Sequence, residues 1–116
     1  MKPFVPRGNT IAITAAATAP DAVAASVTTG KYSVGQYRVI NAGTVTAFLG
    51  FDRVAATAKT NAAVVSTSGT AIPLLPGAVE VLSFSDSTQL SAPEIYFSAA
   101  TASSTATIYI TPGEGL

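Results

Sequence analysis

The sequence contains no cysteine, no histidine and no tryptophan among its 116 residues. Zinc fingers, iron–sulfur clusters and thiol catalysis need cysteine or histidine, and a serine nucleophile is usually activated by a histidine base. Ser-x-x-Lys and Gly-x-Ser-x-Gly motifs are missing as well. These absences exclude the commonest routes to covalent and zinc-dependent catalysis.

Charged residues are also scarce. Six Lys and Arg balance six Asp and Glu, and charged residues make up 10% of the chain, whereas about 25% is usual in globular domains. A neutral chain lacks the electrostatic attraction that binds nucleic acid or anionic membranes, so we expect neither as a partner. So few charges would solvate a monomer poorly, which favours a homo-oligomer or a component of a larger assembly.

Small and turn-forming residues dominate what is present: 22 Ala, 16 Thr, 11 Ser, 9 Gly and 7 Pro. Apolar and polar residues alternate with a period of two, which is typical of strands with one buried face. This alternation predicts six half-buried β-strands, at residues 10–14, 37–41, 45–51, 79–81, 94–98 and 105–111. A further strand is expected around 23–28, and the low-information segment 54–65 is expected to supply one or two weak strands.

Turn-forming clusters separate these stretches at short intervals, and eight or so short strands in one domain are typical of a sandwich or barrel. We therefore predict an all-β, single-domain antiparallel β-sandwich that is jelly-roll-like. Other Greek-key sandwiches fit the same pattern. The sandwich domain is predicted to span residues 10–116, after an extended arm at residues 1–9 in which Pro3 and Pro6 favour an open conformation.

Carboxylates offer the remaining route to catalysis. Glu80 and Glu94 could in principle flank a glycosidic bond, but few other polar groups are available to orient a substrate. Asp86 lies in a Ser-Asp-Ser-Thr turn without the spacing of a calcium loop, so we expect it to bond its own backbone. The sequence thus predicts no enzyme, no cofactor and no metal.

Aromatic side chains are better candidates for a functional surface. Phe48, Tyr96 and Tyr109 each lie on the face opposite the aliphatic residues of their own strand, where a ring could pack against a neighbouring subunit or stack on a sugar. Phe4 and Arg7 in the arm have few uses within the domain. We predict that these five residues lie at an interface with another subunit or with a larger assembly. The alternative is that the strand faces are reversed, or that the domain covers both faces itself.

Three stretches resemble those of a known family: residues 37–48 (YRVINAGTVTAF), 75–81 (LPGAVEV) and 106–115 (ATIYITPGEG). They resemble small β-rich virion proteins of tailed bacteriophages, of the capsid decoration or cement type. The resemblance implies a multimer, with a trimer favoured, that is made in the host cytoplasm. It would bind the major capsid protein on the exterior of the virion and reinforce the shell.

An alternative class of function is a receptor-binding or carbohydrate-binding module of a phage fibre or spike, or another structural component of the head or tail. Sugar sites usually combine Trp or Tyr with Asp, Asn or Arg. Tryptophan is absent here, and asparagine occurs only at positions 9, 41 and 61. A small enzyme with paired carboxylates is the third and weakest alternative.

Overall fold

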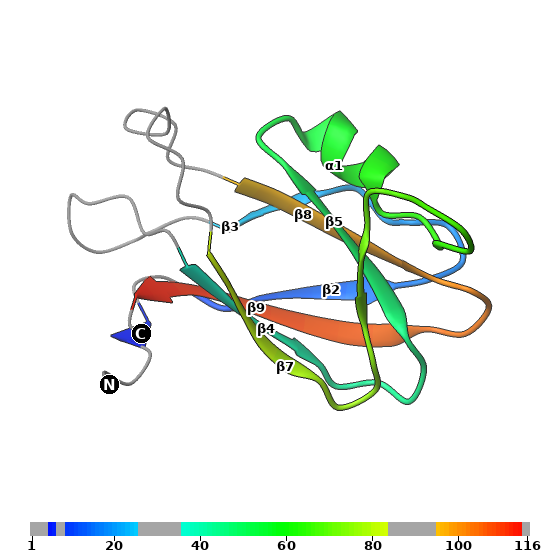
Figure 1. Cartoon of the computed structure of the whole chain (residues 1–116). Coiled ribbons are helices and arrows are strands. Elements are labelled where there is room, and N and C mark those ends of the chain that lie inside the picture. The colour runs from blue at the N-terminus through cyan, green and yellow to red at the C-terminus, as the bar shows by residue number, and fades with distance from the viewer. Residues whose placement is uncertain (1–4, 7–8, 26–35, 84–94, 115–116) are drawn as a thin grey trace.

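The structure is a computed structural model that describes residues 5–6, 9–25, 36–83 and 95–114, and in it two antiparallel sheets pack face to face (Figure 1). The first sheet has the strand order β2 (Ile11–Ala15), β9 (Ala106–Glu114), β4 (Gln36–Asn41) and β7 (Val79–Ser83), with β1 (Val5–Pro6) also paired to β9. The second sheet has the order β3 (Val23–Ala25), β8 (Ile95–Thr101), β5 (Ala47–Asp52) and β6 (Ile72–Leu74).

This strand order is that of a jelly roll. The chain passes from one sheet to the other at every connection from β2 to β9 except the one between β5 and β6, and eight strands arranged in this way form two Greek keys. The predicted all-β antiparallel sandwich is therefore confirmed. The topology also selects the jelly roll from the Greek-key folds that the sequence left open.

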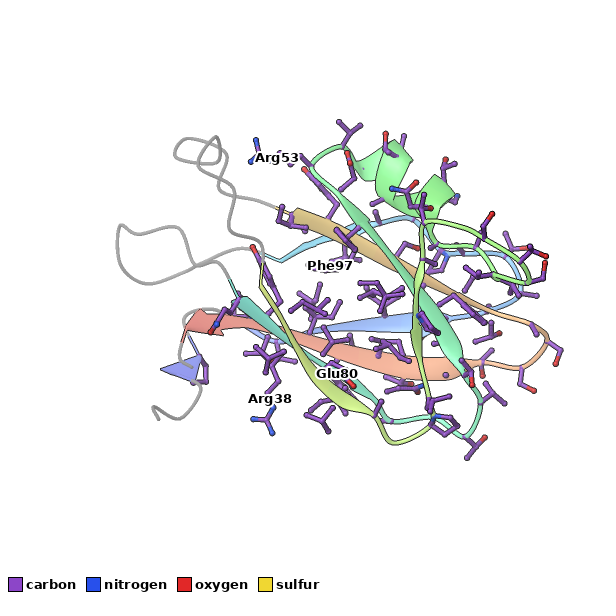
Figure 2. All side chains as sticks on the ribbon, in the orientation of Figure 1. Arg38, Arg53, Glu80 and Phe97 are labelled. Atoms are coloured by element: carbon purple, nitrogen blue, oxygen red, sulfur yellow. The ribbon has the colours of Figure 1, made fainter. Side chains whose placement is uncertain are left out.

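The core lies between the two sheets. It consists of inward-facing side chains that alternate along the strands: Ile13, Ala15, Tyr37, Val39, Ile108 and Ile110 from the first sheet, and Ala47, Leu49, Leu74, Ile95, Phe97 and Ala99 from the second. Phe97 is fully buried between the sheets, as Figure 2 shows. Its ring meets that of Tyr37 edge to face at 5.3 Å and lies 6.3 Å from that of Phe51.

Two elements differ from the prediction. Residues 54–65 were expected to form weak strands, but they contain the helix α1 (Ala55–Asn61), because alanine is the strongest helix former and the Val54 carbonyl accepts from the Ala58 amide at 2.9 Å. β6 was not predicted, since it is only three residues long and contains Pro73. Proline is tolerated there because β6 is at the edge of its sheet.

β7 shows a difference in which face is buried. Val79 and Val81 share one face, as their alternation predicts, but this face points away from the core and both side chains are exposed. Glu80 lies on the inward side of the same strand and is exposed as well. A charge at this position of an edge strand hinders pairing with the edge of another sheet.

Burial raises the pKa of Tyr37 above its usual value of 10.0. The unfolded chain therefore releases the Tyr37 phenol proton more readily than the folded chain. The contribution of neutral Tyr37 to stability is complete below about pH 10 and is lost as the pH rises through the folded-state pKa.

We expect the free energy of unfolding to fall as the pH rises above about 10, and to fall less in Tyr37→Phe. Urea denaturation at pH 9 and pH 11 measures this. Parallel losses in Tyr37→Phe and wild type would contradict the expectation.

Candidate functional site

The outer face of the second sheet is covered by the chain itself. Helix α1 lies over this sheet (Figure 1), and it comes so close that a Cβ at Gly50 would lie 2.3 Å from the Ala62 nitrogen. Gly50 pairs with Ser98, whose hydroxyl donates to the Pro20 carbonyl at 2.7 Å. The small residues of this cross-strand pair thus allow both α1 and the segment before β3 to approach the sheet.

Gly50→Ala is expected to be destabilising by about 1 to 3 kcal/mol, because the added methyl would overlap backbone atoms of α1 that cannot rotate away. Urea denaturation monitored by circular dichroism measures the loss. Gly69→Ala is the matched control, since the nearest atom to its new Cβ is the end of the Val65 side chain on an exposed loop. Equal stabilities of the two variants would show that α1 does not require glycine at position 50.

Phe48 and Tyr96, both predicted to be interface residues, lie on this covered face and are half-buried. Phe48 pairs with Pro73 and Ala100 at one end of the sheet, and Tyr96 pairs with Asp52 at the other. The row that contains Gly50, over which α1 packs, separates the two rings. The structure therefore does not join Phe48 and Tyr96 into one surface.

Tyr109, the third predicted aromatic residue, lies on the outer face of the first sheet, on the opposite side of the molecule. Phe4 and Arg7 lie outside the described residues, so their assignment stays a prediction. Of the arm, Val5 and Pro6 pair with Glu114 and Gly113 of β9. The predicted boundary between residues 9 and 10 also stays a prediction.

Tyr109 occupies the middle of an apolar row across the first sheet. Ala12 of β2 pairs with Tyr109, Tyr109 pairs with Ile40 of β4, and Ile40 pairs with Val79 of β7. Directly paired residues point to the same face, so these four side chains form a continuous outward-facing strip. Tyr109 is 41% and Val79 52% exposed, and no described helix covers them. We call this strip the apolar row, and the outer surface of β2, β9, β4 and β7 the open face.

Polar residues border the apolar row on both sides. On one side Thr14 pairs with Thr107. On the other side the hydroxyls of Thr10 and Thr111 are hydrogen-bonded at 2.6 Å, and Thr111 pairs with Arg38.

Arg38 is the charged side chain among the outward positions that the structure describes on β2, β9, β4 and β7. It points away from the sheet on the side remote from Phe97, as Figure 2 shows. An apolar strip with hydroxyls and a single cation around it is suited to packing against another surface, because burying it removes few charges from water.

The sequence offered a signal for part of this row. Val39 and Ile40 are adjacent β-branched residues of one strand, so one of them must point outward wherever the other is buried. Ala12 and Val79 carried no such signal, because alternation shows which residues share a face and not which face is covered.

Acidic side chains were the other candidates that the sequence offered for a functional site. Among residues 5–6, 9–25, 36–83 and 95–114, no three acidic side chains gather where they could hold a metal ion. Glu94 lies outside these ranges, so its pairing with Glu80 is untested. Within the same ranges, no helix is long and apolar enough to cross a membrane.

No known protein-family model matches the sequence, and a search of curated proteins finds no significant similarity. The functional assignment therefore depends on the jelly roll, the open face and the resemblance described above.

Proposed function

We propose that this protein is a non-enzymatic structural component of a tailed-bacteriophage virion, which decorates the capsid exterior as a multimer and stabilises the shell. The observation that carries the proposal is the apolar row, which lies on an otherwise weakly charged sheet. Such a surface provides a place for association and few groups for catalysis.

The fold is compatible with this role and does not by itself establish it. Jelly rolls occur both in viral capsid proteins and in lectins, and one fold serves many functions. The choice of a capsid component depends on the resemblance of residues 37–48, 75–81 and 106–115 to decoration proteins. These stretches cover most of β4, the first three residues of β7 and all of β9, which are three of the four strands of the open face.

The mechanism needs only binding. A protein that binds the assembled shell more tightly than its free subunits stabilises the shell by mass action. Many copies on one lattice multiply a small contribution per site, because each bound copy raises the effective concentration around its neighbours. The major capsid protein is the partner, and synthesis would take place in the host cytoplasm before attachment.

The direct test is co-purification with phage particles from cells that produce the protein. We expect the chain to remain on purified particles, and particles made without it to lose their genome at a lower temperature. Its absence from purified particles would contradict the proposal. Full-length chain with Val79→Arg should attach less, and Val64→Arg, a substitution at a similarly exposed valine after α1, should attach normally.

The arm provides a second test. Deleting residues 1–7 should leave the sandwich folded, because only the two paired residues of β1 are lost from the described sheets, and it should weaken attachment to the shell. Circular dichroism reports the fold, and pelleting with purified shells reports attachment. Full occupancy by the truncated protein would remove the arm from the proposed contact.

A glycan-binding module is the second candidate, and one observation favours it. Tyr109 stands on a sheet face between threonine hydroxyls and close to Arg38, which is the kind of ring and donor set on which a sugar stacks. Binding of the isolated protein to a glycan array, lost in Tyr109→Ala, would favour this candidate over the capsid component.

A further inference from the structure

We infer that the open face is an interface between two copies of this chain, packed face to face about a two-fold axis that runs parallel to the strands between β9 and β4. The inference rests on the proposed function, because it names a partner for the same apolar row. The partner that covers the open face is a second copy of this chain, because the two copies of the face are complementary to one another.

The strand register of the first sheet determines which residues of the two copies such an axis would bring into contact. Rotation about it places β4 of one copy over β9 of the other and β7 over β2. Tyr109 then faces the partner's Ile40, and Ala12 faces the partner's Val79. Ala12, the smallest side chain of the apolar row, thus meets the exposed Val79. Tyr109, the largest, meets the half-buried Ile40.

The polar rim matches itself in the same arrangement. Arg38 lies one row from the apolar row, and the axis places it over the partner's Thr111, whose hydroxyl is bonded to that of Thr10. A guanidinium has only donors and a hydroxyl oxygen accepts, so the two groups are complementary. The two Arg38 side chains lie on either side of the axis, about 4.8 Å apart along the sheet, and each is directly opposite the partner's Thr111.

Three other described surfaces are less suited to self-association. On β7, at one edge of the first sheet, Glu80 occupies an inward position and hinders extension by another sheet. At the β6 edge of the second sheet, Pro73 lacks an amide hydrogen. Helix α1 occupies the outer face of the second sheet. Within the part of the chain that the structure describes, no helix or strand covers the open face.

The size of the face predicts a weak dimer. Strands about 4.8 Å apart with a rise of about 3.4 Å per residue give four strands of six residues a footprint of roughly 400 Å². A stable interface removes about 800 Å² of accessible surface from each partner. We therefore expect a dimer that forms at high concentration, in solution or between copies held on a lattice.

Sedimentation equilibrium of the full chain, from about 10 µM to about 1 mM, tests the association. The apparent mass should rise from 11.6 kDa towards twice that value. Val79→Arg places two new cations in the interface and should raise the dissociation constant at least about tenfold. Val64→Arg is the matched control, since Val64 is 48% exposed against 52% for Val79, and it should not change the mass. A monomer throughout, or equal effects of the two variants, would overturn the inference.

Cross-linking tests the direction of the axis, and the absence of native cysteine removes any background. A mixture of Ala12→Cys and Val79→Cys should be joined by a bismaleimide that spans about 10 Å, the distance between stacked sheets. Ala12→Cys alone should not be cross-linked to a second copy, because the two copies of position 12 would also be three strand spacings, about 14 Å, apart along the sheet. Efficient cross-linking of Ala12→Cys alone would overturn this axis.

The same variants distinguish a failure of the inference from a failure of the proposed function. A protein that is monomeric at all concentrations, yet loses shell binding in Val79→Arg, would use the open face for the capsid, and the inference alone would fall. A trimer mass would also overturn the inference and leave the capsid role intact. A dimer that does not bind phage particles would contradict the proposed capsid function and support the proposed dimer interface.

Discussion

Phe97→Ala is expected to lower the free energy of unfolding by about 3 to 5 kcal/mol, the range found when a buried aromatic ring is truncated to a methyl group. Phe97 is fully buried between the sheets, and its ring packs against Tyr37 of the first sheet and Phe51 of the second. Removing it leaves a cavity at the position where the two sheets contact one another, and strands on both sides hold that cavity open.

Urea denaturation measures this loss, with Phe48→Ala as the control. Phe48 is half-buried on the outer face of the second sheet, so its truncation should be less destabilising. The Phe97→Ala dimer, if the chain remains folded, should form as in the wild type, because the change is remote from the apolar row. A loss in Phe97→Ala no larger than that in Phe48→Ala would contradict the assignment of Phe97 to the centre of the core.

Asn41→Leu is expected to lower stability by about 3 to 5 kcal/mol, although it replaces one buried side chain by another of similar size. The Asn41 amide donates to the Val45 carbonyl at 2.9 Å and to the Leu74 carbonyl at 2.8 Å, and its oxygen accepts from the Gly43 amide at 2.9 Å. Leucine would leave all three backbone groups without these partners, the Leu74 carbonyl at a buried site and the other two at part-buried sites.

The position of Asn41 explains why these bonds matter. It ends β4 of the first sheet, and the carbonyls that it binds lie in the turn before β5 and at the end of β6, both next to the second sheet. Asn41 therefore fixes one end of the sandwich across the two layers. Gly43, in the same turn, passes so close to Ala106 that a Cβ there would lie 2.5 Å from the alanine methyl.

Chemical denaturation of Asn41→Leu and of Asn61→Ala compares Asn41 with an asparagine that makes fewer hydrogen bonds and is less buried. Asn61 makes one longer bond, 3.3 Å to the Phe51 carbonyl, at a part-buried site, so its loss should be limited to about 1 kcal/mol. Wild-type stability of Asn41→Leu would show that the hydrogen bonds across the layers contribute little.

The sequence determined the strands better than their arrangement. The alternation in residues 105–111 is strong, because Ile108 and Ile110 are buried while Tyr109 between them is exposed. The pairing of β2 with β9 joins Ile11 to Ile110, at opposite ends of the chain, and no local pattern encodes a contact of that range. Jelly-roll order follows from such long-range pairings, so the sequence left it open.

The helix was missed for a different reason. Alanine and threonine in residues 54–65 are compatible with helix or strand, and no apolar stripe of helical period decides between them. What stabilises α1 is tertiary: Gly50 and Ser98 provide a flat surface on which a helix of small residues can lie. That surface exists only once β5 and β8 have paired.

Of the four residues in the apolar row, the sequence predicted one, Tyr109, as part of a functional surface. Tyr109 was identified as an outward ring, and the structure places it at the centre of the open face. Its neighbours come from β2, β4 and β7, and their outward direction depends on which side of each strand the second sheet covers. Phe48 and Tyr96 had the same sequence signal as Tyr109, yet they lie on the face to which α1 is packed.

The solvent accessibility of the Tyr109 ring tests most directly whether the open face is the surface of association. Hydroxyl-radical labelling can be compared between dilute protein and protein that is concentrated or bound to phage particles, with Tyr96 on the opposite face as the internal reference. We expect labelling of Tyr109 to fall several-fold on association while labelling of Tyr96 stays the same. Undiminished labelling of Tyr109 in associated protein, or equal protection of both rings, would contradict the assignment of the open face.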